Sequence, residues 1–174
     1  MLLVVPDQYY AKHAQRVPSQ FRDAGYAVVV ASKSGATVQV CSSDGFMQVD
    51  LSLADVRVAD YDAVVYMGGY GCRDQWYDEE SHHIARDAVA EGTVLGAIGC
   101  APTILAHAGV LEGRQTAICR SAALVKRGAD YCSIVESLGA TCSDAPLVRD
   151  GRIVTAVPAS GDFAPAIIEV INEG

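Results

Sequence analysis

The order of short apolar runs and helix-compatible segments constrains the fold of this chain more than any other feature. The apolar runs are rich in β-branched residues, and polar segments that end at Gly25 and Gly92 separate them. The runs are LLVV at 2–5, YAVVVA at 26–31, DAVVYM at 62–67 and TVLGAI at 93–98. Near-continuous apolar strands that alternate with helices are typical of a parallel sheet covered on both faces. We therefore predict an α/β fold with a mostly parallel central sheet.

The remaining segments add smaller elements to this core. Two alternating runs flank Asp44-Gly45, a pair that favours a tight hairpin turn, and a second hairpin is predicted around Asp150-Gly151. Helices are expected at 11–24, 79–91, 101–108 and 162–172, one or two more within 121–138, and a strand at 114–119. The sequence contains no internal repeat or linker-like stretch, so we predict a single domain over residues 1–174.

Composition excludes several classes of partner. Thirteen basic and 21 acidic residues give a formal charge of −8, which disfavours binding to a phosphate backbone, so no nucleic acid partner is predicted. No run approaches the roughly eighteen apolar residues of a membrane span. The segment MLLVVPDQYY lacks the basic region and cleavage site of a signal peptide. We predict a soluble, cytoplasmic protein that does not associate with membranes.

The cysteines are numerous but lie far apart in the sequence. Six are present, at positions 41, 72, 100, 119, 132 and 142. A chain of this size without an export signal does not need disulfides, so we expect thiols. No spacing matches a zinc site, and we predict neither a metal nor a cofactor.

Two segments at the predicted carboxyl ends of strands carry unusual residues. One is Gly68-Gly69-Tyr70-Gly71-Cys72 and the other is Gly99-Cys100. Ligands of open α/β sheets bind outside the carboxyl ends of the strands. We therefore expect the functional site to lie where these two segments meet.

Three blocks in the same order resemble the ThiJ/PfpI family, which includes a parkinsonism-associated protein deglycase and archaeal intracellular proteases. They are YDAVV at 61–65 with Gly68-Gly69, AIGCAPTILAHAGVLEGR at 97–114 and VRDGRIVTA at 148–156. The resemblance implies a flavodoxin-like three-layer sandwich of the class I glutamine amidotransferase type. It also implies a homodimer or larger homo-oligomer and a small carbonyl or amide ligand.

The resemblance breaks at the positions that carry the family's chemistry. An ungapped alignment of 97–114 places Gly99 at the position of the family's nucleophilic cysteine, and Cys100 falls one residue later. The position of the family's glutamate falls on His13, or on Ala14 with one deletion, and that of its histidine falls near Cys119. A step of one residue around a tight turn changes the direction of a side chain.

Two hypotheses from different classes follow. In the favoured one, the chain lacks the family's usual Cys-Glu-His chemistry and acts as a thiol-bearing stress-response or small-ligand-binding protein. In the other, Cys100 is a nucleophile in a deglycase-, glyoxalase- or amidase-like reaction, with His13 or Cys119 as its helper.

The hypothesis of catalysis also needs an oxyanion site and a cleft. The backbone amides of Gly68 and Gly69 are the candidate oxyanion donors, and Gly99 and Ala101 form the turn. Tyr70 and Trp76 are candidates for the wall of the cleft, although Trp76 and Tyr77 suit a buried loop anchor or a dimer contact equally well.

Three cysteines are expected near this cleft if the two loops face each other. Cys72, Cys100 and Cys119 would then form a redox pair or a site for a soft metal, with scattered thiols as the alternative. His82 and His83 begin a charged helix and are interpreted as solvated.

Overall fold

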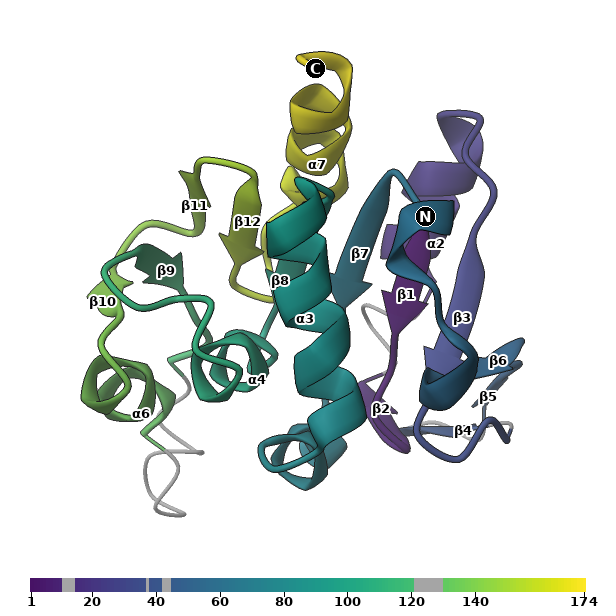
Figure 1. Cartoon of the computed structure of the whole chain (residues 1–174), viewed down its shortest axis with the longest axis horizontal. Coiled ribbons are helices and arrows are strands. Elements are labelled where there is room, and N and C mark those ends of the chain that lie inside the picture. The colour runs from purple at the N-terminus through teal and green to yellow at the C-terminus, as the bar shows by residue number, and fades with distance from the viewer. Residues whose placement is uncertain (11–14, 37, 42–44, 121–129) are drawn as a thin grey trace.

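The computed structural model describes residues 1–10, 15–36, 38–41, 45–120 and 130–174. Its main sheet has seven strands in the order β11-β12-β8-β7-β1-β3-β6 (Figure 1). The strands are β1 (Leu2–Val4), β3 (Val29–Ser32), β6 (Leu51–Ser52), β7 (Ala63–Tyr66), β8 (Val94–Ile98), β11 (Leu147–Asp150) and β12 (Ile153–Ala156). Among the described strands of this main sheet, only β11 and β12 pair antiparallel, which confirms a mostly parallel sheet.

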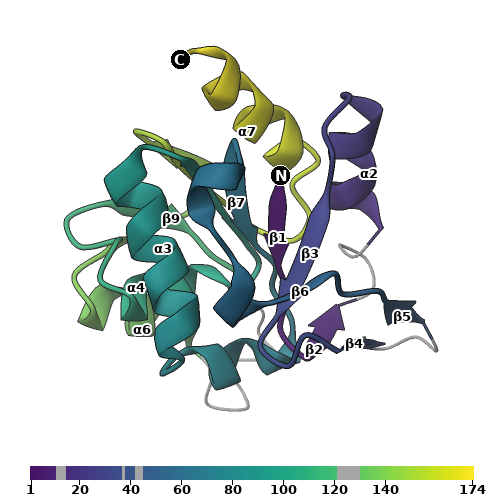
Figure 2. The same cartoon turned by 45° about the vertical axis from the view of Figure 1, so that its right-hand side comes forward.

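Helices cover both faces of this sheet and complete a three-layer sandwich. The helices on one face are α3 (Glu79–Glu91), α4 (Pro102–His107) and α6 (Tyr131–Ser137), and those on the other are α2 (Arg16–Asp23) and α7 (Phe163–Asn172). The two groups lie on opposite sides of the strands when the molecule is turned (Figure 2). This is the predicted flavodoxin-like architecture.

Strand β7 shows why the apolar runs are nearly continuous. Val64 and Tyr66 pack in the core cluster beneath α3 and α4, whereas Ala63 and Val65 pack in the cluster beneath α2 and α7. Successive side chains of a strand point to opposite faces, and here both faces are buried. No polar position interrupts the strand, because neither side meets water.

Smaller elements lie outside the main sheet. The strands β2 (Gln8–Tyr10), β4 (Val38–Cys41) and β5 (Phe46–Met47) form one small sheet, and β9 (Gln115–Ala117) pairs with β10 (Thr141–Ser143) in another. Three 3-10 helices are η1 (Leu53–Asp55), η2 (Val58–Asp60) and η3 (Tyr70–Gln75). Antiparallel pairing of β4 with β5 confirms the first hairpin, and β11 with β12 confirms the second.

The prediction that His82, near the start of α3, is solvated was wrong. His82 is 5% exposed, not solvated as predicted, and burial lowers the pKa of its imidazole. Asp78 is the N-cap of this helix: its carboxylate accepts the N–H of Ser81 and pairs with Lys33. His82 lies with Ser81 on the buried side of the first turn of α3.

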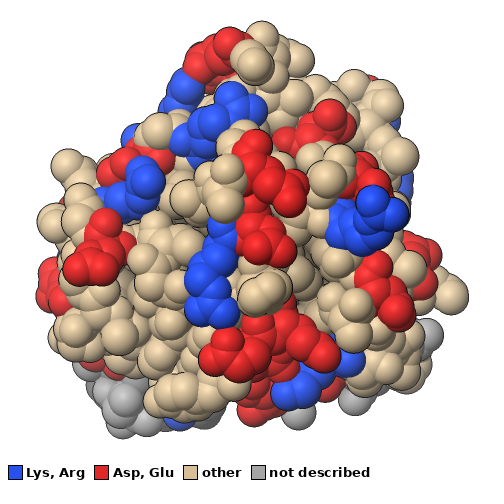
Figure 3. All heavy atoms as spheres, in the orientation of Figure 1, with Lys and Arg blue, Asp and Glu red and all other residues tan. Residues whose placement is uncertain are grey.

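Charge is mixed over the molecular surface. Acidic and basic side chains alternate on the face shown in Figure 3, without a broad patch of Lys and Arg among the residues described there. Within the described ranges, no helix has the length and apolar character needed to cross a membrane.

Candidate functional site

The turns after β7 and β8 meet at the carboxyl edge of the sheet, and Gly68 is the point of closest approach. A Cβ added to Gly68 would lie 2.5 Å from the carbonyl oxygen of Ile98 and 3.0 Å from the amide nitrogen of Cys100. These are rigid backbone atoms that a side chain could not displace cheaply. Glycine at this position allows the two turns to pack against each other.

The sharp corner between β8 and α4 lies at Gly99. Its φ of +78° falls in the left-handed region that favours glycine, and its N–H donates to the carbonyl of Ala156 at 2.8 Å. A Cβ at Gly99 would have its nearest neighbours, including Pro158, at 3.6 Å. The corner therefore has room for a side chain but holds none, and Cys100 follows it.

Cys72 of η3 and Cys100 form a buried pair of thiols. Their Sγ atoms are 2.7 Å apart, and the side chains are 1% and 9% exposed. The N–H of Gly69 donates to both sulfurs at 3.3 Å, and the Cys100 thiol lies 3.2 Å from the Gly69 carbonyl oxygen. The Gly69 amide, a candidate oxyanion donor, is thus already bonded to sulfur.

The pKa values of the two thiols are shifted in opposite directions. The hydrogen bond from Cys72 lowers the pKa of Cys100, against the opposing effect of burial, and the Gly69 N–H lowers it further. Burial raises the pKa of Cys72 well above its ordinary value. When the pair loses one proton, the negative charge therefore lies on Cys100, and Cys72 remains the hydrogen-bond donor.

Two residues beside this pair escaped the sequence analysis. Tyr131, the first residue of α6, packs in the same core cluster as Cys72 and Cys100, and the positive charge of Arg73 acts to lower its pKa. Burial, with the charge of the two sulfurs, raises the pKa of Tyr131 to about 12, so it stays neutral. The charge of Arg73 also favours the Cys100 thiolate. Arg73 could have been found from the sequence because it directly follows Cys72. No pattern in the sequence around Tyr131 indicated that it would lie near the cysteine pair.

Trp76 braces the loop after β7. Its Nε1–H donates to Thr103 Oγ1 at 2.7 Å, and the Thr103 hydroxyl donates to the carbonyl of Cys100 at 2.7 Å. The indole also stacks on His107 at 5.1 Å between ring centroids. These contacts match the interpretation of Trp76 as a loop anchor, and they hold Cys100 against the loop that carries Cys72.

Cys119 is attached to the same corner but lies in another pocket. Its N–H donates to the Gly99 carbonyl at 2.9 Å. With Arg120 and Pro158 it lines a pocket of about 320 Å³, and neither Cys72 nor Cys100 is among the described lining residues. The structure thus brings together two of the three cysteines expected at the cleft.

The other predicted site residues take structural places or lie beyond description. The Ala101 N–H closes the turn by donating to the carbonyl of Ile98 at 3.4 Å. Tyr70 begins η3, but its side chain is outside the described part of the structure, and His13 lies in the undescribed segment 11–14.

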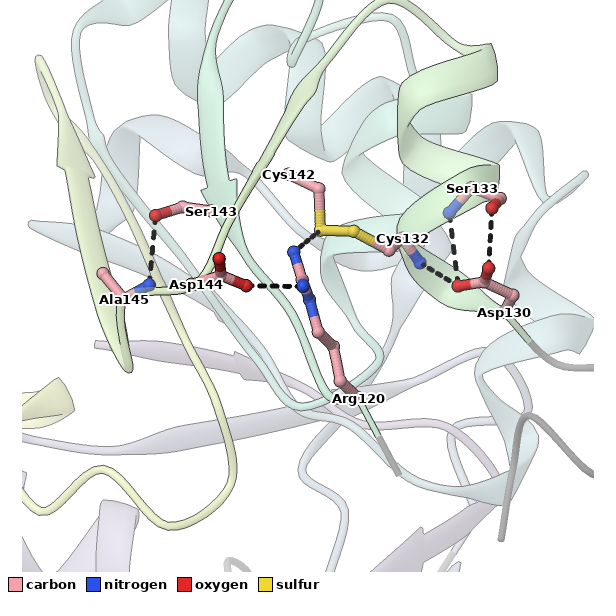
Figure 4. A network of polar contacts seen from close by, with 8 residues as sticks. All are labelled: Arg120, Asp130, Cys132, Ser133, Cys142, Ser143, Asp144 and Ala145. Atoms are coloured by element: carbon pink, nitrogen blue, oxygen red, sulfur yellow. Dashed lines mark hydrogen bonds and ion pairs between the residues drawn. A yellow bond between two sulfur atoms is a disulfide. The ribbon is translucent and has the colours of Figure 1, made fainter. Parts of the chain in front are cut away.

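The expectation of six thiols was wrong at two positions. Cys132 of α6 and Cys142 of β10 form a disulfide, with their Cα atoms 5.7 Å apart (Figure 4). The cause is tertiary, because α6 packs directly on β10 and brings the two cysteines within bonding distance.

Similarity to known proteins identifies the family of this chain. The model of the DJ-1/PfpI family matches residues 2–170. The chain belongs to the DJ-1/PfpI family. It is 29% identical to a deglycase of Pyrococcus abyssi, over 90% of this chain and 88% of the relative, and 30% identical to a deglycase of Pyrococcus horikoshii, over 80% and 79%.

A solved structure agrees with this assignment. The crystal structure of a ThiJ/PfpI domain protein from Brachyspira murdochii has a TM-score of 0.87 and 29% identity, and the match covers 99% of this chain and 96% of the other. The strand-to-helix corner of this DJ-1/PfpI protein lies at Gly99, the residue that the sequence analysis predicted to align with the family's nucleophilic cysteine. The nearest sulfur belongs to the following residue and contacts a second thiol.

Proposed function

We propose that this DJ-1/PfpI protein is a thiol-based stress-response protein in which Cys100 and Cys72 form a peroxide-sensitive dithiol. The carrying observation is the buried pair of sulfurs 2.7 Å apart, with a lowered pKa on Cys100. A disulfide bond is about 2.05 Å long, so a small movement would convert the contact into a bond.

The chemistry uses the different acidities of the two thiols. The Cys100 thiolate attacks one oxygen of a hydroperoxide, forms a sulfenic acid and releases an alkoxide, or hydroxide from hydrogen peroxide. Cys72 then attacks the Cys100 sulfur, the S–S bond forms, and hydroxide leaves and takes up the Cys72 proton as water. A cellular thiol reductant returns the pair to the dithiol state.

Burial favours a small oxidant over a bulky substrate. At 9% exposure, Cys100 offers little of its surface to a glycated side chain, whereas a peroxide needs contact with one sulfur only. Carbonyl chemistry also requires free N–H donors for an oxyanion, and the Gly69 N–H is bonded to sulfur.

The test is treatment with hydrogen peroxide followed by alkylation, intact-mass measurement and peptide mapping. We expect loss of two hydrogens from the protein and a linked Cys72–Cys100 peptide pair. The Cys72→Ser variant should stop at the sulfenic acid on Cys100, and Cys100→Ser should give neither product. A Cys72–Cys100 pair that stays reduced while other cysteines oxidise would refute the proposal.

A second candidate is a cysteine-dependent deglycase- or glyoxalase-like reaction at Cys100, because two relatives are named deglycases. Turnover of methylglyoxal by the wild type, abolished in Cys100→Ser, would support it. The Gly99→Cys variant places a thiol at the family's nucleophile position, where the corner has room for one. Methylglyoxal turnover by Gly99→Cys but not by the wild type would show that the fold still supports the reaction, and that the wild-type thiol at position 100 is not placed to perform it.

We also propose that the protein acts as a homodimer, as the resemblance to the family implies. Tyr77, which the sequence analysis named as a candidate dimer contact, is 80% exposed and is therefore accessible to a second copy. Light scattering coupled to size-exclusion chromatography should give twice the monomer mass, and a monomer at micromolar concentration would contradict this.

A further inference from the structure

The disulfide between Cys132 and Cys142 lies within a network of polar side chains that includes Arg120, Asp130 and Asp144 (Figure 4). Arg120 places its Nη2 3.1 Å from Cys142 Sγ and its Nη1 2.5 Å from a carboxylate oxygen of Asp144. Both cysteines are half-buried, so an external thiol can reach the bond. On the Cys132 side, the Asp130 carboxylate accepts the backbone N–H of Cys132 at 3.2 Å. The two sulfurs therefore have different surroundings, because the cation contacts Cys142.

We propose that Cys132–Cys142 is an exchange-active disulfide that takes a dithiol as its reductant, either a small dithiol or a redox protein with two vicinal thiols. In this site Cys132 is the sulfur that is attacked, and Cys142 is the leaving sulfur. Arg120 determines the direction, because a guanidinium beside a sulfur favours its thiolate form, and a more acidic thiol leaves faster.

The exchange proceeds in two balanced steps. A thiolate of the reductant attacks Cys132 Sγ, the S–S bond to Cys142 breaks, and Cys142 leaves as a thiolate beside Arg120. The second thiolate of the reductant then attacks its own sulfur in the mixed disulfide and releases Cys132. The reductant becomes a disulfide, its two electrons reduce the protein, and its two protons pass to the protein thiols.

A metal site is the competing interpretation of the same residues. Ligand atoms of Cys132, Glu136 and Cys142 all lie within 4.8 Å of one another, a spacing that would suit a thiophilic divalent ion after reduction. The Arg120 cation, however, already contacts Cys142 Sγ and would repel a metal ion. The charge at this sulfur favours exchange with a thiol.

The redox state of this disulfide also bears on the buried pair, and this part rests on the proposed function. Tyr131 precedes Cys132 in the first turn of α6 and packs in the core cluster with Cys72 and Cys100. The disulfide joins that turn to β10 and so restrains Tyr131 within the core cluster that contains the dithiol. Reduction removes this tether, and access to Cys100 should increase.

Reduction by dithiothreitol, followed by alkylation and mass spectrometry at successive times, tests the exchange. Arg120→Gln should slow reduction of Cys132–Cys142 about three- to tenfold, because the leaving thiolate loses its cation. Asp144→Asn is the matched control: it keeps the guanidinium on Cys142 and should reduce at least as fast as the wild type. Equal rates in Arg120→Gln and wild type, or a bond that reacts only after unfolding, would overturn the proposal.

Two further measurements separate this proposal from the proposed function. Cys100→Ser cannot carry out the peroxide chemistry, but its Cys132–Cys142 bond should be reduced at the wild-type rate. A Cys132–Cys142 bond that does not exchange in this variant would contradict the exchange proposal and leave the proposed function untouched. In the wild type, prior reduction should raise the rate of iodoacetamide labelling at Cys100 at least twofold. Unchanged labelling would remove the link to the buried pair.

Discussion

The two pairs of cysteines differ in the groups that surround their sulfur atoms. Cys72 and Cys100 are buried, and a backbone N–H from Gly69 bonds both sulfurs. Cys132 and Cys142 are half-buried, and a side-chain cation contacts one of them. The buried pair suits a small oxidant, whereas the outer pair suits exchange with another thiol. Local solvent access and charge, more than the presence of two sulfurs, determine the chemistry.

The largest expected effect concerns the backbone that brings the buried pair together. Gly68→Ala should lower the free energy of unfolding by about 3 kcal/mol, since its Cβ would overlap the carbonyl of Ile98. The same variant should abolish formation of the peroxide-induced bond between Cys72 and Cys100. Urea denaturation and peptide mapping measure the two effects.

The matched control for that variant is Gly99→Ala. Its Cβ has room, so only the positive φ opposes it, and the loss should be about 1 kcal/mol. Equal losses in the two variants would show that close approach at Gly68 does not hold the turns together.

The outer pair should contribute more to stability than the buried pair. Replacing Cys132 and Cys142 together with serine removes a cross-link that spans ten residues. We expect the free energy of unfolding to fall by about 2–3 kcal/mol, because the unfolded chain regains loop entropy. Urea denaturation under non-reducing conditions measures it. Cys72→Ser, which breaks no covalent bond between elements, is the comparison and should lose less.

The buried pair should show a pH dependence that the residue at position 72 controls. In the wild type, alkylation of Cys100 should increase with pH through a pKa below the roughly 8.5 of an ordinary thiol, because Cys72 donates to the thiolate. Cys72→Ala removes the donor, so the pKa should rise and labelling at pH 7 should slow about tenfold.

Cys72→Ser is the control for that pH profile, since a hydroxyl also donates a hydrogen bond. Its profile should stay close to that of the wild type. Parallel profiles for the alanine and serine variants would mean that Cys72 does not set the acidity of Cys100.

The smallest effect is expected at the N-terminus of α6, on the side of the outer pair. A hydrogen bond from Ser133 lowers the pKa of Asp130. Its stabilisation is therefore present above the unfolded pKa of about 3.9 and is lost as the pH falls through the folded value. Asp130→Ala should lower the Tm slightly at pH 7 and not at pH 2, and calorimetry at the two values checks this. A Tm difference that persists at pH 2 would assign the effect to packing.

Much of the fold was predictable because two buried faces leave a continuous mark on each strand. The runs of β7 and β8 contain no polar interruption, and a glycine follows within two residues of the end of each described α-helix that lies between strands. Strand β10 was missed because Thr141–Ser143 is short and polar and none of its residues is fully buried. Its pairing with β9 joins segments that are distant in the sequence.

The site was predictable only where strand ends determine it. Carboxyl ends of neighbouring parallel strands lie at one edge, so the meeting of the Gly68 and Cys100 turns followed from the order of elements. The place of Tyr131 and the Cys132–Cys142 bond depend on how α6 docks on the rest of the molecule. Docking of a helix is a property of the packed surfaces, and no local pattern encodes it.

At the corner formed by Gly99, the backbone conformation and the position of the thiol are separate features. The bend is held by main-chain hydrogen bonds and by the positive φ of Gly99, which a side chain at that position would strain, while the thiol lies on the residue that follows. Transferring an activity between members by aligned position alone is therefore unsafe. For each member of the family, the position of the reactive atom in the structure has to be established.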